Sequence, residues 1–325
     1  MIRGGNGASS AGGLGGPGNV GVVLNGGTLT TSGKIVGGKG GPWTRGGEAG
    51  WNAYALDMGN LAGTLVLDPG AVFVGEVLAY SAVNNVLELS GVANEFIRRG
   101  TLAGLGSEYV GFTTLSVDAG AFWTLSGANT LGASASLLDD GNLRVTGQLT
   151  DAGNVTLETN AVLRAGVGGT LLVDEVTLAG GTISGFGVIV GANLVDNGII
   201  TASGGTLTLM RAVSGSGKLF IDRGATLVAE KSLGVAVMKF ETNGDATLTL
   251  DEPASMTSTV SGFGLGDMID LTGVAATSLG FAEGTLTLYN GTAVVDTIAF
   301  HGSYSTANFT LQSNTQGSDI GYVHI

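Results

Sequence analysis

Apolar and polar residues alternate in short stretches along most of the chain. The stretch LSVDAGAFWTL (115–125) holds two such alternations on either side of an Asp-Ala-Gly, and Thr206–Leu209 and Thr247–Leu250 both read Thr-Leu-Thr-Leu. Successive side chains of a β-strand point to opposite faces, so this pattern predicts strands with leucine on one face and threonine on the other. Helical periodicity is nearly absent, and very little helix is expected.

The turns between the predicted strands share one motif, Asp-x-Gly. The aspartate carboxylate can accept a hydrogen bond from the backbone N–H two residues on, and glycine supplies the positive φ that a tight corner needs. The copies are Asp68-Pro69-Gly70, Asp118-Ala119-Gly120, Asp139-Asp140-Gly141, Asp151-Ala152-Gly153, Asp196-Asn197-Gly198 and Asp222-Arg223-Gly224.

A second motif, Gly-Thr-Leu or Gly-Thr-Ile, marks the start of predicted strands over nearly the whole chain. Its seven copies begin at Gly27, Gly63, Gly100, Gly169, Gly181, Gly205 and Gly284. Short strands with turns at this spacing are compatible with a sandwich, a barrel or a solenoid. Reuse of the same corner chemistry favours a solenoid, because each coil of a solenoid stacks only on its neighbours and repeats one plan.

We therefore predict an all-β fold, a right-handed parallel β-helix (β-solenoid) with irregular coils of about 20 residues and a C-terminal β cap. Residues 1–240 are assigned to the β-helix and residues 241–325 to its continuation or cap. Residues 37–60 are rich in glycine, contain Trp43, Trp51 and Tyr54, and are predicted to form a long loop or loops projecting from a coil.

Composition limits the function classes. With 43% hydrophobic and 12% charged residues the chain has ample apolar surface to bury and should fold. The net charge of −13 repels nucleic acid and anionic membranes, so neither is expected as a partner. The sequence has no window of about 18 apolar residues, so no transmembrane segment is expected. The absence of cysteine excludes disulfides and thiolate zinc sites.

Several stretches resemble the repeats of large exported proteobacterial proteins, the autotransporter-like and filamentous-haemagglutinin-like adhesins. They are residues 100–131 (GTLAGLGSEYVGFTTLSVDAGAFWTLSGANTL), 194–230 and the closing segments 246–273 and 300–313. The resemblance covers most of the chain as a style of repeat and includes no catalytic signature. It implies a right-handed β-helical protein that is secreted or lies at the bacterial cell surface and acts in adhesion, biofilm matrix or cell contact.

Enzymatic candidates are few. The adjacent carboxylate pairs are Asp139-Asp140, Asp174-Glu175 and Asp251-Glu252. Neighbours along a strand point to opposite faces, so adjacency does not build the paired carboxyl groups of a glycosidase. The two histidines, His301 and His324, lie near the end without a Gly-x-Ser-x-Gly motif, and His301-Gly302 is interpreted as a turn after a strand over Val294–Phe300.

Two binding sites are weighed against structural roles. Asp267 and Asp270 could bind Ca²⁺, since carboxylates suit a hard cation, but a capping turn with side-chain-to-backbone bonds is favoured and no cofactor is otherwise expected. Trp43, Trp51 and Tyr54 could stack on sugar rings, but folding back over the coil end beneath them is favoured.

We predict a structural protein for presentation or adhesion, without catalysis, whose partners are host or neighbouring-cell surfaces, glycans or further copies of itself. A polysaccharide lyase or glycosidase is the alternative. Acidic side chains from successive coils that meet in one groove would favour this alternative.

Overall fold

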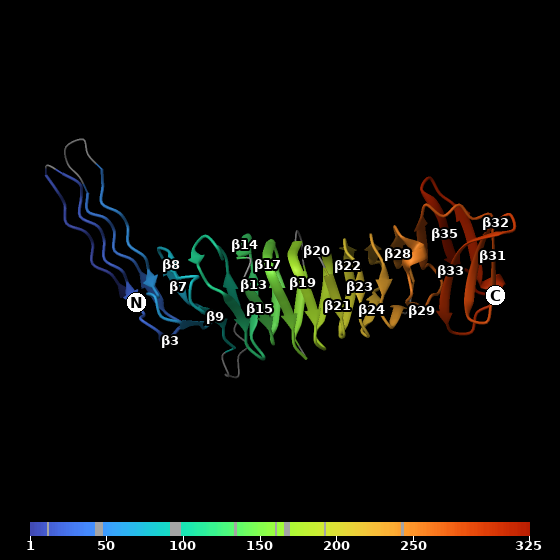
Figure 1. Ribbon diagram of the computed structural model, residues 1–325, viewed down its shortest axis with the longest axis horizontal. Coiled ribbons are helices and arrows are strands. Elements are labelled where there is room, and N and C mark those ends of the chain that lie inside the picture. Colours follow the sequence, from blue (N-terminus) through green and yellow to red (C-terminus); the bar gives the residue numbers. More distant parts are fainter. Residues whose placement is uncertain are drawn as a thin grey trace. The chain divides into compact units, whose positions relative to one another are not determined.

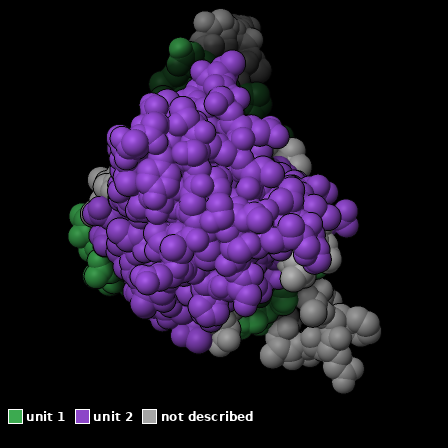
Figure 2. Space-filling view, turned by 90° about the vertical axis from the view of Figure 1, so that its right-hand side faces the viewer, with its two compact units in different colours: residues 1–153 green, residues 154–325 purple. Residues whose placement is uncertain are grey.

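The computed structural model describes residues 1–11, 13–42, 48–91, 99–132, 135–159, 161–165, 170–191, 193–241 and 244–325. It divides into two compact units, residues 1–153 and 154–325, which Figure 2 distinguishes by colour. The described residues form β-strands and two 3₁₀ helices of three residues each, η1 (Pro253–Ser255) and η2 (Thr306–Asn308). The expectation of very little helix is confirmed.

In unit 1, the chain winds through short parallel strands, and each strand pairs with the corresponding strand of the next coil (Figure 1). The strands are β1 (Ile2–Arg3), β2 (Val22–Val23), β3 (Gly27–Thr31), β4 (Lys34–Val36), β5 (Leu56–Asp57), β6 (Gly63–Leu67), β7 (Val72–Val74), β8 (Val77–Leu78), β9 (Val86–Leu89), β10 (Gly100–Leu102), β11 (Tyr109–Val110), β12 (Thr114–Val117), β13 (Phe122–Leu125), β14 (Ala128–Leu131), β15 (Ser136–Asp139), β16 (Asn142–Val145) and the first residues of β17 (Gln148–Leu157), whose last four residues belong to unit 2.

The interior of unit 1 is built from columns of apolar side chains. Register places Leu65 beside Leu87, Leu87 beside Leu115 and Leu115 beside Leu137, on β6, β9, β12 and β15. All four leucines are fully buried. Each coil therefore covers the apolar residues of the next, which confirms the predicted solenoid stacking.

Unit 2 repeats this plan. Its strands are β18 (Val162–Ala165), β19 (Thr170–Leu178), β20 (Thr182–Val190), β21 (Asn193–Asp196), β22 (Ile199–Leu209), β23 (Val213–Ser214), β24 (Lys218–Ile221), β25 (Thr226–Ala229), β26 (Leu233–Gly234), β27 (Val237–Phe240), β28 (Thr247–Leu250), β29 (Thr259–Ser261), β30 (Met268–Thr272), β31 (Ser278–Ala282), β32 (Thr285–Asn290), β33 (Ala293–His301), β34 (Phe309–Ser313) and β35 (Gly317–Tyr322). A second buried column runs through Leu207, Leu227, Leu248 and Ile269.

Coil length varies, as predicted. Partners on successive coils are 17 residues apart between Thr182 and Ile199, and 36 apart between Gly27 and Gly63. The parallel pairing continues to β30, where β35 adds in antiparallel orientation. β31, β32 and β33 form an antiparallel meander, and β34 pairs with β35. These antiparallel strands are the predicted C-terminal β cap.

The cap has an aromatic core. The ring of Phe263 lies 5.2 Å from Phe240, 5.8 Å from Phe300 and 6.2 Å from both Phe309 and Tyr322, measured between ring centroids. The last parallel coils are thus joined to the cap strands by aromatic packing. The cap covers an end that would otherwise expose strand edges.

The Asp-x-Gly corners are of two kinds. At Asp68, Asp118 and Asp222 the main-chain carbonyl accepts the N–H three residues on, at 2.9 to 3.0 Å, and the glycine has positive φ. At Asp139 and Asp196 the side-chain Oδ1 accepts the N–H of the glycine two residues on, at 2.9 and 2.8 Å. The turn predicted at residues 151–153 is wrong, because these residues lie within β17.

Candidate binding face on a glycine-rich lobe

The first two coils of unit 1 extend into a lobe of four nearly straight segments, drawn in blue in Figure 1. Segment I spans residues 4–10, segment II 14–21, segment III 36–42 and segment IV 48–54. The sequence predicts a long loop or loops projecting from a coil over residues 37–60. Residues 37–42 and 48–54 contain no β-strand and belong to the projecting lobe (Figure 1), where backbone hydrogen bonds tie them to residues 4–21 as extended segments. Leu56–Asp57 form β5.

Two pairs of segments run parallel, with bonds at every third residue. In segment I, the N–H groups of Gly4 and Gly7 donate to the carbonyls of Val36 and Lys39 in segment III, at 2.9 and 2.8 Å. In segment II, the N–H groups of Gly15, Gly18 and Gly21 donate to Glu48, Trp51 and Tyr54 in segment IV, at 3.0 to 3.2 Å. A period of three is the repeat of a polyproline II helix.

The other contacts are antiparallel with the same period. Segment II donates to segment I through Gly16 and Asn19, segment III donates to segment II through Gly38 and Gly41, and segment IV donates to segment III through Gly50 and Ala53. These bonds are 2.8 to 3.0 Å long. Since a polyproline II helix makes no internal hydrogen bonds, its backbone groups are free to bond several neighbours at once.

Glycine makes this packing feasible. A Cβ on Gly40 would lie 1.7 Å from the carbonyl oxygen of Gly50, and one on Gly15 would lie 2.0 Å from that of Gly41. The described residues of the lobe therefore pack in its interior through backbone atoms and not through a side-chain core. Its rigidity comes from hydrogen bonds between segments, and its side chains are left on the outside.

Residues three apart share one face of a threefold helix, so each segment carries three rows. On segment II, the row of Gly15 and Gly18 is turned toward segment III, and the row of Gly16 and Asn19 bonds segment I. The third row, Leu14, Pro17 and Val20, therefore faces outward. On segment IV, Gly50 faces inward and Asn52 Oδ1 accepts the N–H of Gly40 at 3.1 Å. The remaining row is Glu48, Trp51 and Tyr54.

These two rows form the outer face of segments II and IV. Leu14 exposes 70% of its surface, Trp51 82% and Tyr54 36%. The bonds from Gly15 and Gly18 to Glu48 and Trp51 set the rows side by side. Of the predicted ligand-binding residues, Trp51 and Tyr54 thus lie on one face, one helical turn apart, and Trp43 lies outside the described residues.

The outer face of segments I and III is different. Asn6 Oδ1 accepts hydrogen bonds from Arg3 Nη2, at 3.2 Å, and from the N–H of Lys39, at 3.1 Å. Arg3 and Lys39 are exposed. The lobe thus has a basic, polar outer face on segments I and III, and an apolar, aromatic one on segments II and IV.

The predicted calcium ligands do not converge. Asp267 is buried, and its two carboxylate oxygens accept the N–H groups of Ala246, at 3.2 Å, and Gly264, at 2.9 Å. Asp270 lies on the solvent side of β30 and accepts a 3.0 Å bond from Asn314 Nδ2. Asp267 therefore has the turn-capping contacts expected of a structural aspartate. Among the described residues, no group of three His, Asp or Glu side chains is placed to hold a metal ion.

The sequence predicts that adjacent carboxylates do not form paired sites, and Asp139 and Asp140 agree with this. Asp139 is buried whereas Asp140 is exposed, Asp251 accepts a bond from Thr272, and Glu252 pairs with Lys231. The side chain of Asp174 lies outside the described residues. His301 ends β33 and precedes a turn at Gly302, as predicted.

A carboxyl pair that the sequence did not reveal lies on successive coils. Glu88 on β9 and Asp118 after β12 are within hydrogen-bonding reach of each other, and Asp140 adds its charge from the next coil. Burial, followed by the proximity of Asp118, raises the pKa of Glu88 above its ordinary value. Burial also raises the pKa of Asp118. Only the coil register brings these residues together.

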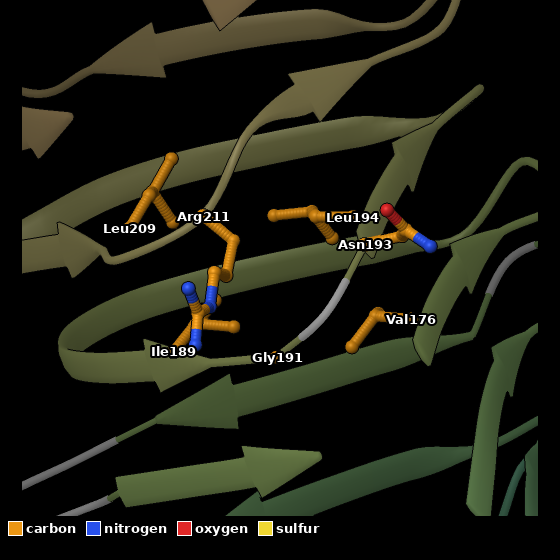
Figure 3. A pocket seen from close by; sticks show the side chains of 7 residues that line it. All are labelled: Val176, Ile189, Gly191, Asn193, Leu194, Leu209 and Arg211. Atoms are coloured by element: carbon orange, nitrogen blue, oxygen red, sulfur yellow. The ribbon is translucent and has the colours of Figure 1, made fainter. Parts of the chain in front are cut away.

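Three cavities among the described residues have none of Glu88, Asp118 and Asp140 in their linings. A cleft of about 240 Å³ in unit 1 is lined by Leu105, Tyr109, Phe112 and their neighbours, and one of about 360 Å³ in the cap by Asn290, Asn314 and Gln316 among others. Neither has an Asp or Glu in its lining. A third, of about 10 Å³, lies between apolar side chains of unit 2, with Arg211 extending toward Ile189 (Figure 3). It has room for about one water molecule.

Helices long and apolar enough to cross a bilayer are absent from the described part of the chain. The sequence matches no protein-family profile and no curated protein.

Proposed function

We propose that this protein is a secreted or cell-surface β-solenoid that presents a binding face and adheres to glycans, without catalysis of its own. The exposed Trp51 carries the proposal. A tryptophan with 82% of its surface in solvent, on a lobe held rigid by backbone bonds, is suited to contact a partner. The resemblance to exported adhesin repeats supports the same role.

The interior of the fold agrees with presentation. The described columns pack leucine on leucine from coil to coil, so the coils themselves serve as a scaffold. The observed clefts lack acidic groups for acid–base catalysis.

The proposal is tested by binding of the whole chain to a glycan array and by adhesion of protein-coated beads to bacterial and animal cells. We expect retention on a subset of glycans, and loss of bead adhesion when those glycans compete. Absence of binding to every glycan and every cell surface would overturn the proposed function.

A glycan-cleaving activity is the second candidate, favoured by Glu88 and Asp118. Glu88 and Asp118 lie on successive coils with raised pKa values, and carboxyl groups that hold a proton more strongly can serve in general acid–base cleavage of a polysaccharide. Incubation with acidic and neutral polysaccharides, followed by assays for new reducing or unsaturated ends, tests it. Activity that Glu88→Gln abolishes would establish the enzyme and replace the non-catalytic proposal.

A further inference from the structure

We propose that the outer face of segments II and IV binds an extended, neutral, β-1,4-linked polysaccharide, with Trp51 and Tyr54 stacked on every second sugar. This inference rests on the proposed glycan-binding function and specifies its ligand. The relevant observations are the spacing of the rings, the shape of the face and its charge.

The spacing follows from the backbone. Trp51 and Tyr54 are three residues apart on a segment whose bonds repeat every three residues, so they occupy the same row. One turn of a polyproline II helix rises by about 9 Å. That is close to the length of two sugars in an extended β-1,4-linked chain, in which every second sugar has the same orientation. The face therefore repeats with the period of such a chain.

The shape of the face also selects an extended ligand. A threefold helix keeps each row straight along its axis, so both rings lie on one line. Leu14 and Pro17 of the neighbouring row run parallel to that line and are exposed. Equatorially linked sugars present flat C–H faces that stack on aromatic rings, whereas α-linked glucans curl away from a straight row. The rigid backbone lowers the cost of ordering the site upon binding.

Charge favours a neutral polymer. Within the two rows, Glu48 is the charged residue, and it is exposed one turn before Trp51. The exposed basic residues lie elsewhere: Arg3 precedes segment I, Lys39 lies on segment III, and both bond Asn6 of segment I. A polyanion would therefore be repelled by Glu48 on one face and attracted on the other.

The first test is calorimetric titration of the whole chain with cellohexaose, chitohexaose and maltohexaose. We expect binding of a β-1,4-linked hexasaccharide, no binding of maltohexaose, and at least about tenfold weaker binding for both Trp51→Ala and Tyr54→Ala. Tyr80→Ala removes an aromatic side chain, 43% exposed, that lies off the two rows and should leave the affinity unchanged. The melting curve confirms that each variant is folded.

A gain-of-function variant tests the period itself. Glu48→Trp adds a third ring one turn before Trp51. We expect this variant to bind the β-1,4-linked hexasaccharide about tenfold more tightly, and to bind the corresponding tetrasaccharide with unchanged affinity. A loss of folding cannot mimic this result. An equal gain for both lengths would overturn the proposed spacing.

The remaining outcomes separate the two proposals. Three results would overturn this inference while a positive glycan array leaves the glycan-binding function standing. They are binding to alginate or heparin alone, equal affinity for maltohexaose and the β-1,4-linked hexasaccharides, and an affinity that Trp51→Ala does not change. If the array and the cell-adhesion assay are both negative, the proposed function and this inference are both overturned.

Discussion

Two aspartates occupy positions in the solenoid where other coils place apolar residues. Asp139 stands beside Val117, which stands beside Leu89, and Asp196 stands beside Leu178. Both aspartates are fully buried. In each, Oδ1 accepts a backbone N–H and Oδ2 has no hydrogen-bond partner among the described residues. Burial raises the pKa of Asp139 to about 7 and that of Asp196 to about 6.

We expect the free energy of unfolding to fall as pH rises from about 4 to 8. Folded Asp139 keeps its proton up to pH about 7, whereas the unfolded chain releases it near 3.8, so the folded state binds more protons between these values. The loss attributable to Asp139 is of the order of 2–4 kcal/mol. Urea denaturation of the whole chain at a series of pH values measures it.

Asp139→Asn keeps the acceptor for the Gly141 N–H and removes the titration. It should flatten the dependence on pH, and a second change, Asp196→Asn, should flatten it further. A slope identical to that of the parent chain in the double variant would contradict the assignment.

Among elements, the four glycine-rich segments depend on close backbone approach at particular positions. Gly40→Ala would force a methyl group against the Gly50 carbonyl, so we expect segments III and IV to separate. Faster hydrogen exchange and earlier proteolytic cleavage within residues 4–54 would report this separation.

Gly13→Ala is the matched control for Gly40→Ala. Its nearest neighbour would be Ser10 Oγ at 3.5 Å, an ordinary contact, and its φ is not in the positive range. It should leave exchange and cleavage unchanged. Equal effects of the two substitutions would show that the segments do not pack as described.

The cap depends on Phe263, whose ring touches four other aromatic rings. We expect Phe263→Ala to lower the free energy of unfolding by about 3–5 kcal/mol, because truncating a buried aromatic side chain leaves a cavity. Leu265→Ala, at a position 69% exposed, is the control and should cost less than about 0.5 kcal/mol. Denaturant unfolding, followed by a spectroscopic signal from unit 2, distinguishes the two variants.

At the scale of the whole molecule, charge is unevenly divided along the chain. Residues 1–56 contain four basic residues and one acidic residue, whereas residues 57–325 contain nine basic and 25 acidic residues. The glycine-rich lobe therefore does not share the strongly acidic character of the rest. A partner that the net charge excludes from the coils is not excluded from the lobe on that ground.

Calcium should not stabilise the fold beyond its effect on ionic strength. Asp267 has both oxygens bonded to backbone N–H groups, and Asp270 is held by Asn314. We expect equal melting temperatures in millimolar Ca²⁺ and in EDTA, when NaCl or Mg²⁺ balances the ionic strength. A rise specific to Ca²⁺ would show a site, since a ligand of the folded state stabilises by mass action.

Local sequence signals predict the all-β class, most of the coil corners and the cap, because alternation by two and Asp-x-Gly turns depend on neighbouring residues alone. Local signals also identified Trp51 and Tyr54 as candidate ligand-binding residues. Glycines also recur at every third position, such as Gly4 and Gly7 or Gly15, Gly18 and Gly21. This spacing is typical of packed threefold helices and is the local signal that corresponds to the lobe.

Contacts between residues of different coils depend instead on the three-dimensional packing. Glu88 and Asp118 are 30 residues apart, and Asp139 is buried because its strand sits in register with Val117 and Leu89. The glycine-rich segments form a lobe only through bonds between residues as distant as Gly4 and Val36. A strand pattern fixes which face a side chain takes, but register between distant segments depends on packing that no single stretch contains.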